Sequence, residues 1–179
     1  MIKKTLIAVA VVLVVFLIVV ALRPAEYSVT RSATIAAPAE TVFTQVNELK
    51  KWEAWNPWGK IDPAMKLTYT GPASGVGAAY AWVGNNEVGE GRMTITESRP
   101  PGRILFNLEF FKPMAGVSIT EFTFKPAGNQ TTVTWTMTGK NNYIAKAFCM
   151  LMNMDKMIGG QFEKGLVELK AVAEAAVKK

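Results

Sequence analysis

Histidine is absent from the 179 residues, and cysteine occurs once, as Cys149. Without histidine, the chain has no Ser-His-Asp or Cys-His arrangement and none of the commonest zinc sites. A single cysteine excludes an internal disulfide, and no neighbouring basic cluster activates it, so we expect Cys149 to be a buried apolar side chain. The glycine-rich stretches 71–77 and 84–91 complete no phosphate-binding or dinucleotide-binding motif. We therefore predict neither a metal nor a cofactor.

Charge is also sparse outside the N-terminus. The chain has 20 basic and 14 acidic residues, and three of the basic ones, Lys3, Lys4 and Arg23, flank an apolar N-terminal run. The rest of the chain carries a net charge of about +3, whereas nucleic-acid binding requires a concentrated basic face. The sequence therefore predicts no nucleic-acid partner.

Residues 5–22 form an apolar run without a charge. As a helix with a rise of about 1.5 Å per residue, they span roughly 27 Å, enough for the hydrocarbon core of a bilayer. A cleaved signal peptide is the alternative, but its apolar stretch is normally about 7–15 residues and ends in a small-residue cleavage site. We predict an uncleaved signal-anchor over residues 1–23 and one globular domain over residues 24–179.

The basic residues predict the orientation of this segment. Lys3 and Lys4 place the N-terminus in the cytoplasm, and Arg23 and Arg31 on the far side weaken this bias without reversing it. We expect a single-pass membrane protein that contacts the bilayer through residues 5–22. Its globular domain then faces the extracytoplasmic space, which is the periplasmic side of the inner membrane in a Gram-negative cell.

The globular part combines strands with helices. Alternating apolar and polar residues, bounded by Gly, Pro and Asn turns, predict seven strands with short links, which indicates an antiparallel sheet. Two short helices are predicted after the first strand, the second of them carrying Trp52, Trp55 and Trp58. The seven strands are predicted over residues 27–35, 66–70, 78–83, 91–97, 103–110, 117–124 and 131–138.

The C-terminal part is predicted to be helical. Residues 143–154 are apolar and rich in methionine, and residues 155–177 have apolar side chains at helical spacing, with Asp155 as the predicted N-cap. Gly159, Gly160 and Gly165 lower the helix propensity by about 1 kcal/mol each, which close approach to the sheet would explain. We predict an α+β helix-grip fold, in which a curved seven-stranded antiparallel sheet surrounds this long helix.

The element order and several motifs resemble the START-like (Bet v 1-like, SRPBCC) superfamily, and within it the bacterial polyketide cyclase/dehydrase-like proteins. The motifs are Trp52-x-x-Trp55-Asn56-Pro57-Trp58, Gly75-Val76-Gly77, Trp82, Gly89-Glu90-Gly91-Arg92-Met93 and Thr131-Thr132-Val133-Thr134-Trp135. The resemblance covers about residues 26–177. It implies a cavity between the sheet and the C-terminal helix that holds apolar ligands.

Strand parity predicts which residues line that cavity. Tyr80 and Trp82 share one face of a strand, and the same alternation predicts aromatic and aliphatic inward faces on the other strands. The alternative is a filled core. The predicted lining consists of Arg31, Trp55, Trp58, Tyr80, Trp82, Met93, Glu97, Phe106, Phe110, Trp135 and Phe162.

Two groups of side chains have alternative interpretations. The Trp52/Trp55/Trp58 trio either forms the rim of a ligand entrance or plugs the open end of the sheet, and the plug is the commoner arrangement. The methionines 150, 152, 154 and 157 form either an adaptable ligand-facing wall or ordinary core, and again the core is commoner.

Few polar groups are available for catalysis. Arg31 and Glu97 are in phase with inward-facing neighbours, so they either pair, bind the polar end of a ligand, or extend to solvent at the strand ends. General acid–base chemistry has no candidates beyond Glu97, Tyr80, Tyr69 and Arg31, and no catalytic pair is predicted. We expect a membrane-tethered domain that binds a hydrophobic, lipid-like small molecule. The alternatives are a cyclase or aromatase-type enzyme, and a module with a filled core that contacts an envelope protein.

Overall fold

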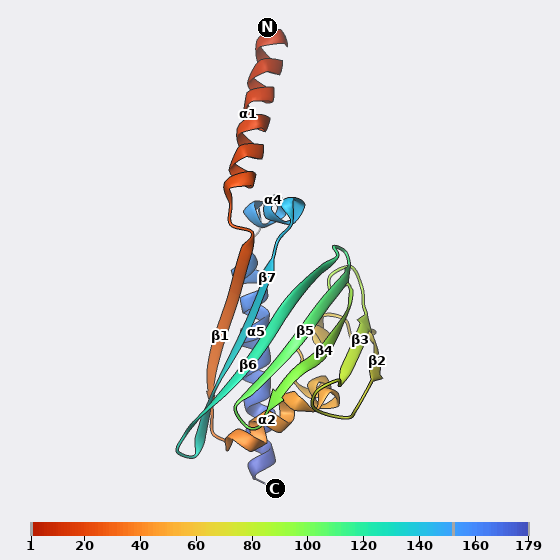
Figure 1. Cartoon of the computed structure of the whole chain (residues 1–179), viewed down its shortest axis with the longest axis vertical. Helices are drawn as coiled ribbons and strands as arrows, with labels where there is room; N and C mark the ends of the chain where they lie inside the picture. Colours follow the sequence, from red (N-terminus) through yellow and green to blue (C-terminus); the bar gives the residue numbers. More distant parts are fainter. Residues whose placement is uncertain (1, 152, 179) are drawn as a thin grey trace.

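A computed structural model describes residues 2–151 and 153–178. A long N-terminal helix stands apart from an α+β domain in which seven strands curve around a C-terminal helix (Figure 1). The elements are α1 (Ile2–Leu22), β1 (Glu26–Ile35), α2 (Ala39–Asn47), the 3-10 helix η1 (Leu49–Ala54), α3 (Trp58–Ile61), β2 (Lys66–Thr70), β3 (Ala79–Val83), β4 (Glu90–Arg99), β5 (Arg103–Lys112), β6 (Gly116–Ala127), β7 (Gln130–Lys140), α4 (Tyr143–Leu151) and α5 (Met154–Val177).

All seven strands belong to one antiparallel sheet, in the order β1-β7-β6-β5-β4-β3-β2. From β2 to β7, each strand pairs with the next strand in the chain, whereas β1 pairs with β7 across the domain. The predicted helix-grip fold is therefore confirmed, including all seven strands and the long final helix.

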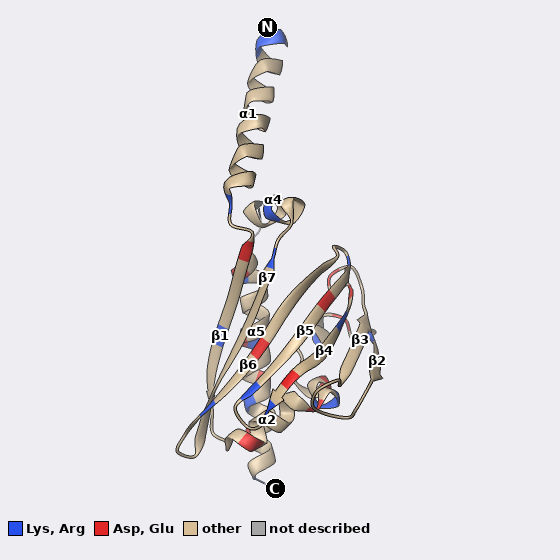
Figure 2. Cartoon of the chain, in the orientation of Figure 1, with Lys and Arg blue, Asp and Glu red and all other residues tan. Residues whose placement is uncertain are grey.

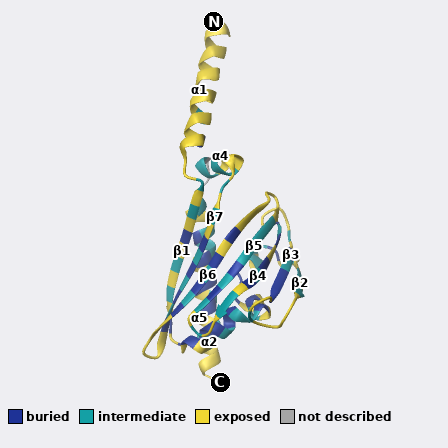
Figure 3. Ribbon diagram, in the orientation of Figure 1, coloured by how far each residue is buried: buried dark blue, intermediate teal, exposed yellow. Residues whose placement is uncertain are grey.

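The helix α1 is long and apolar enough to cross a membrane. Its 21 residues include an 18-residue window of mean hydropathy 3.4, and its side chains are exposed along almost its whole length (Figure 3). Charge is confined to Lys3 and Lys4 at one end of this helix and to Arg23 just beyond the other (Figure 2). An N-terminal helix of this kind acts as a membrane anchor or as a signal sequence.

The concave face of the sheet forms the core with α2, η1 and α5. The inward residues alternate with exposed ones along each strand, so that Val133, Trp135 and Met137 of β7 are buried. On the outer face, Thr30 and Ser32 of β1 form hydrogen bonds with Thr136 and Thr134 of β7. The outer face of β1 and β7 is therefore polar, whereas their inner face is largely apolar.

The helix α5 approaches the sheet closely at two of its glycines. A Cβ atom at Gly159 would lie 2.1 Å from a guanidinium nitrogen of Arg31, and one at Gly165 would lie 2.9 Å from the Trp135 ring. The predicted close approach is thus present at these two positions, whereas Gly160 has open space around it.

The predicted N-cap of α5 is wrong. The side chain of Asn153 accepts a hydrogen bond from the backbone N–H of Lys156, and so caps the helix two residues before Asp155. Asp155 lies in the first turn, where its carboxylate pairs with Arg31 instead. Asn and Asp both favour the N-cap position. Here Asn153 is the cap, and the carboxylate of Asp155 pairs with Arg31 on β1.

Candidate functional site

Nine of the predicted lining residues come together in one aromatic cluster on the concave side of the sheet. Tyr80, Trp82, Phe106 and Trp135 share the same face, as predicted. The rings of Trp135 on β7 and Phe162 on α5 stack with their centroids 4.0 Å apart. The nine residues are Trp55, Trp58, Tyr80, Trp82, Met93, Phe106, Phe110, Trp135 and Phe162.

These side chains pack against one another. Trp55 and Phe106 are fully buried, whereas Trp58 and Phe110 are half-buried at the edge of the cluster. Ring-to-ring contacts connect Trp52 with Phe106 and with Trp135. The middle of the concave face is therefore occupied by aromatic rings, which corresponds to the filled core expected as the alternative to an open cavity.

The Trp trio belongs to this packing. The indole N–H of Trp52 donates to the Val46 carbonyl oxygen at 2.8 Å, and that of Trp55 donates to the Gln45 carbonyl oxygen at 3.2 Å. Trp52 and Trp55 lie inside the core, so they plug the space under the sheet. Trp58 lies in the separate helix α3 and packs on Trp135 and Phe162.

Two described hollows lie at the end of the domain nearest α1, where β1 begins and β7 ends. The larger, of about 620 Å³, lies over the ends of β1, β6 and β7. The smaller, of about 310 Å³, lies between the link from α1 to β1, the helix α4 and the start of α5. None of the eleven predicted lining residues borders either hollow. The smaller hollow is lined by Arg23, Pro24, Glu26, Tyr27, Asn141, Lys146, Cys149, Met150 and Met154.

Two buried polar groups on the concave face have no hydrogen-bonding partner among the described residues. They are the hydroxyl of Thr120 on β6 and the indole N–H of Trp135 on β7. Each residue is 2% exposed. Thr120 pairs directly with Met137, and Phe122 with Trp135, so the two groups occupy diagonal positions on adjacent strands. An unpaired buried polar group costs about 1–3 kcal/mol, so these two require an explanation.

Trp135 was predicted from the sequence to lie on the inner face, whereas Thr120 was not. Ser118 and Thr120 are consecutive inward positions of β6, followed by Phe122 and Phe124. Two polar residues at inward-facing positions of a strand that otherwise turns aromatic side chains inward were the signal that could have revealed Thr120. Ser118 differs from Thr120 because its hydroxyl forms a 2.7 Å hydrogen bond with the Tyr27 hydroxyl.

Arg31 ties the first strand to the last helix. Its Nε donates to a carboxylate oxygen of Glu163 at 2.6 Å, and its terminal nitrogens donate to both carboxylate oxygens of Asp155 at 3.0 Å. Hydrogen bonding with Arg31 lowers the pKa of Asp155, and the two carboxylates raise the pKa of Arg31. Every charged partner of this guanidinium comes from α5, which indicates a structural role between β1 and that helix.

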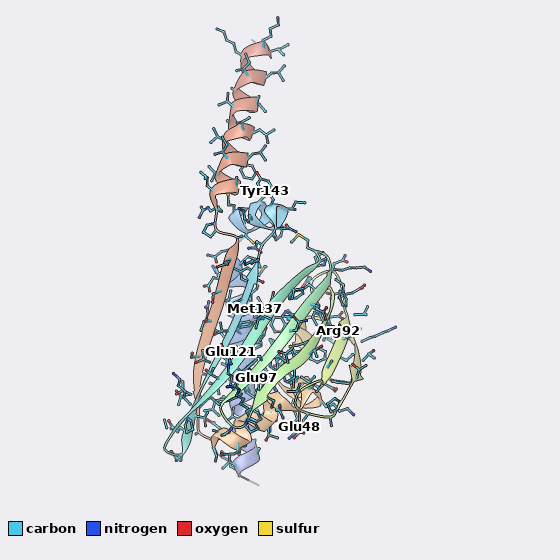
Figure 4. All side chains as sticks on the ribbon, in the orientation of Figure 1. Glu48, Arg92, Glu97, Glu121, Met137 and Tyr143 are labelled. Carbon is cyan, nitrogen blue, oxygen red and sulfur yellow. The ribbon has the colours of Figure 1, made fainter. Side chains whose placement is uncertain are left out.

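Glu97 lies on the outer face of the sheet, so its predicted inward phase is wrong. The register between β4 and β5 shifts between Ile95 and Glu97, where a β-bulge adds one residue to β4. A bulge of one residue moves every following side chain to the other face. Glu97 therefore pairs with Arg103 on β5 at 2.9 Å, and Glu121 on β6, which also pairs with Arg103, lies nearby (Figure 4).

The candidate acid–base groups are not assembled into a catalytic site. Arg31 on β1 and Glu97 on β4 are separated by β7, β6 and β5, and their side chains lie on opposite faces. Burial raises the pKa of Tyr80, and burial together with a hydrogen bond to Glu53 raises the pKa of Tyr69. Both phenols therefore stay protonated at neutral pH. Within the described residues, no group of three His, Cys, Asp or Glu side chains could hold a metal ion.

The methionine-rich segment is at the surface and outside the core. Met150 and Met154 are half-buried beside the smaller hollow, and Met157 is exposed. Met152 lies outside the described residues. Cys149 is half-buried in the same hollow, where burial raises the pKa of its thiol. The prediction of ordinary core is therefore wrong for Met157 and holds only in part for Met150, Met154 and Cys149.

A helix gripped by a curved antiparallel sheet, with an aromatic concave face, defines the class of protein. The family model described as "Polyketide cyclase / dehydrase and lipid transport" matches residues 26–174. The chain belongs to this family. No curated protein sequence matches it.

Solved structures with the same fold span its globular domain. The chain is similar to TTHA0849 from Thermus thermophilus, with a TM-score of 0.61, 20% identity, and coverage of 84% of this chain and 99% of that chain. It is also similar to the Aha1 dimer from Colwellia psychrerythraea, with a TM-score of 0.59, 16% identity, and coverage of 83% and 96%. At these identities the similarity shows the fold alone.

A third similar structure is the di-domain ARO/CYC StfQ from the steffimycin biosynthetic pathway. Its TM-score is 0.62 at 13% identity, and the similarity covers 86% of this chain and 52% of that chain. This chain therefore spans about half the length of that di-domain protein.

Proposed function

We propose that this protein is a membrane-tethered domain that binds a hydrophobic, lipid-like small molecule between the sheet and α5, without transforming it. The observation that supports this proposal is the pair of unpartnered polar groups, Thr120 and Trp135, in an otherwise apolar interior. Binding sites for small molecules are built in this way, from an apolar lining with a few polar groups that fix the orientation of the ligand.

The chemistry of the two groups defines the ligand class. The Trp135 indole can only donate a hydrogen bond, whereas the Thr120 hydroxyl can donate or accept one. A carbonyl, carboxyl or hydroxyl group on an apolar body satisfies both, and its apolar part replaces contacts among the surrounding rings. The description of the family includes lipid transport, and StfQ is described as an ARO/CYC protein, which fits ligands with an apolar body.

Access is expected at the end of the domain nearest α1. Tyr27 and Ile158 are only half-buried there, and the smaller hollow lies beside Tyr27 and Met154. Residues 23–25 alone separate α1 from β1, so an anchored domain stays close to the bilayer. We infer that the ligand enters from the membrane and moves along the concave face towards Thr120 after the nearby side chains shift.

The tether is part of the proposal. In it, α1 spans the bilayer, with Lys3 and Lys4 in the cytoplasm and the globular domain on the opposite side. The span is supported by the length and hydropathy of α1 and by the exposure of its side chains. The separation of Arg31 from Glu97 favours binding over a cyclase-type reaction.

The test compares Thr120→Val with a matched control, Thr136→Val, on the full chain in detergent. Both changes replace a hydroxyl by a methyl group, but Thr136 faces outward and bonds with Thr30. We expect Thr120→Val to raise the free energy of unfolding by about 1–2 kcal/mol, because an unpaired buried hydroxyl disappears. The same change should weaken binding of a dansyl-labelled fatty acid by about 5-fold, since about 1 kcal/mol of hydrogen bonding is lost.

The combination of a more stable protein with weaker binding distinguishes a ligand-binding group from an incidental one. Thr136→Val should leave probe binding unchanged. Mass spectrometry of an organic extract of the purified wild-type protein should also show a co-purifying apolar molecule. If no molecule co-purifies and the labelled fatty acid does not bind, the proposal is wrong, and the module with a filled core becomes the better account.

A further inference from the structure

The helix α4 is fixed to the end of α1 by two side chains. The Tyr143 hydroxyl donates to the Leu17 carbonyl oxygen at 2.7 Å, and Tyr143 lies beside the lower end of α1 in Figure 4. The Lys146 ammonium donates to the carbonyl oxygens of Ala21 at 2.9 Å and Arg23 at 2.8 Å. The last carbonyls of a helix have no partner within the helix, so a lysine there both caps α1 and complements its dipole. The position of α4 along the axis of α1 is therefore set by direct bonds.

One face of α4 is apolar and exposed. Ile144 is 71% exposed and Phe148 is 43% exposed, and their spacing of four residues places them on the same side of the helix. Ala145 and Cys149 are half-buried on the side that faces the domain. The only charged residue of α4 is Lys146, which is occupied by the carbonyls of α1.

The connection between β5 and β6 reaches the same end of the domain. This hairpin tip points towards the side where α4 meets α1 (Figure 1). Phe111 at the end of β5 and Met114 in the connection itself are both exposed. Two separate parts of the domain thus present apolar side chains at the end that carries the N-terminal helix.

We propose that α4 lies in the interfacial layer of the bilayer, with Ile144 and Phe148 inserted among the lipids and the β5–β6 tip as a second contact. This inference rests on the proposed membrane anchoring of α1. An 18-residue span of about 27 Å only just crosses the hydrocarbon core, so Leu22 lies at its boundary and Leu17 about 7–8 Å further in. Because Tyr143 and Lys146 bond to carbonyls of residues 17–23, α4 is placed at the depth where amphipathic helices lie.

A lipid surface fits this face better than a protein partner does. The anchor fixes the height of α4 at the bilayer, whereas nothing in the sequence of α4 provides a polar rim for a protein interface. Tyrosine is enriched at membrane interfaces, and lysine extends its charged end towards water there. The smaller hollow lies directly behind α4, so an inserted α4 places that hollow beside the lipid headgroups.

The test measures the depth of single labels on the full chain in phosphatidylcholine/phosphatidylglycerol vesicles. Cys149→Ser removes the native thiol, and Ile144→Cys or Phe148→Cys then carries an environment-sensitive fluorophore. Two controls bracket them: Val12→Cys within α1, and Val167→Cys, which is 66% exposed on α5. We expect the labels at 144 and 148 to be quenched by lipids brominated near the headgroup. They should also be protected several-fold from aqueous iodide relative to the label at 167.

Each outcome of this experiment decides the inference. If the labels at 144 and 148 are as open to iodide as the label at 167, while the label at 12 is protected, α4 does not insert although the anchor is correct. If the label at 12 is also open to iodide, both the anchor and the inference are wrong. Protection from iodide without quenching by brominated lipid would mean that a protein surface covers α4, and that result also overturns the lipid contact.

Discussion

The two ends of the concave face differ in how completely they are packed. At the end far from α1, Val133 and Ile35 are fully buried, and the buried hydroxyl of Thr131 donates to the Ala37 carbonyl oxygen at 2.8 Å. Towards the end near α1, Thr120 has no partner among the described residues and Tyr27 is half-buried. The same sheet therefore provides a well-packed foundation at one end and a region with unmet polar groups at the other.

The difference in packing suggests that the far end serves mainly stability and the end near α1 mainly function. Folding is driven by burial of apolar surface, and at the far end the fully buried side chains of Val133 and Ile35 contribute to it. The near end retains groups that reduce stability, which is typical of sites shaped for a ligand. The proposed membrane contact lies at this less tightly packed end, and the proposed binding site is reached from it.

The largest expected effect comes from truncating two phenylalanines on the inward face of one strand. Phe106 is fully buried in the middle of β5, whereas Phe110 near the end of the strand is half-buried. We expect Phe106→Ala to lower the free energy of unfolding by about 3–5 kcal/mol, and Phe110→Ala by about half as much or less. Urea unfolding of the full chain in detergent, followed by tryptophan fluorescence, measures both. Equal losses would contradict the difference in packing.

A smaller effect is expected from Tyr27→Phe. This change leaves the buried Ser118 hydroxyl without its 2.7 Å partner, so the free energy of unfolding should fall by about 1–2 kcal/mol. Tyr27→Phe thus creates an unpaired buried hydroxyl at Ser118, whereas Thr120→Val removes one at the adjacent inward position. Ser118→Ala in the Tyr27→Phe background is the control, because removing both hydroxyls should recover part of the loss. An unchanged stability in Tyr27→Phe would show that Ser118 has another partner.

The smallest effect concerns acid stability. The pKa of Asp155 is lowered by its hydrogen bonds with Arg31, so the folded state binds this proton less readily than the unfolded chain does. The stabilising contribution is therefore present above the ordinary pKa of 3.8 and is lost as the pH falls below it. Arg31→Gln should flatten the loss of stability between about pH 4 and about pH 2, measured by urea unfolding across that range. A loss as steep as in the wild type would show that other carboxylates cause it.

The sequence predicted the architecture well because strands and turns leave local signals. Alternation along residues 131–138 and the Gly and Pro turns between strands were sufficient to place every strand within a few residues. The phase of Glu97 was not predictable in the same way, since the bulge after Ile95 carries no glycine or proline to reveal it. Such a shift depends on pairing with β5, which is a property of the folded sheet.

The candidate site was predicted only in part. Nine of the residues predicted to line a cavity pack together in one cluster, and for the six of them on strands parity determines which side the residue faces. Parity does not reveal whether the rings leave a cavity or whether a hydroxyl such as that of Thr120 finds a partner, because both depend on side-chain packing. The position of α4 beside α1 was also beyond the sequence, since it depends on bonds from Tyr143 and Lys146 to distant carbonyls.

The most direct test of the central claim compares the indole N–H groups by nuclear magnetic resonance during titration with a long-chain fatty acid. Trp52 and Trp55 donate to backbone carbonyls, whereas Trp135 has no partner among the described residues. The Trp135 signal, assigned with Trp135→Phe, should shift and gain protection from hydrogen exchange, while those of Trp52 and Trp55 stay in place. A saturating fatty acid that leaves the Trp135 signal unmoved would contradict the proposed site.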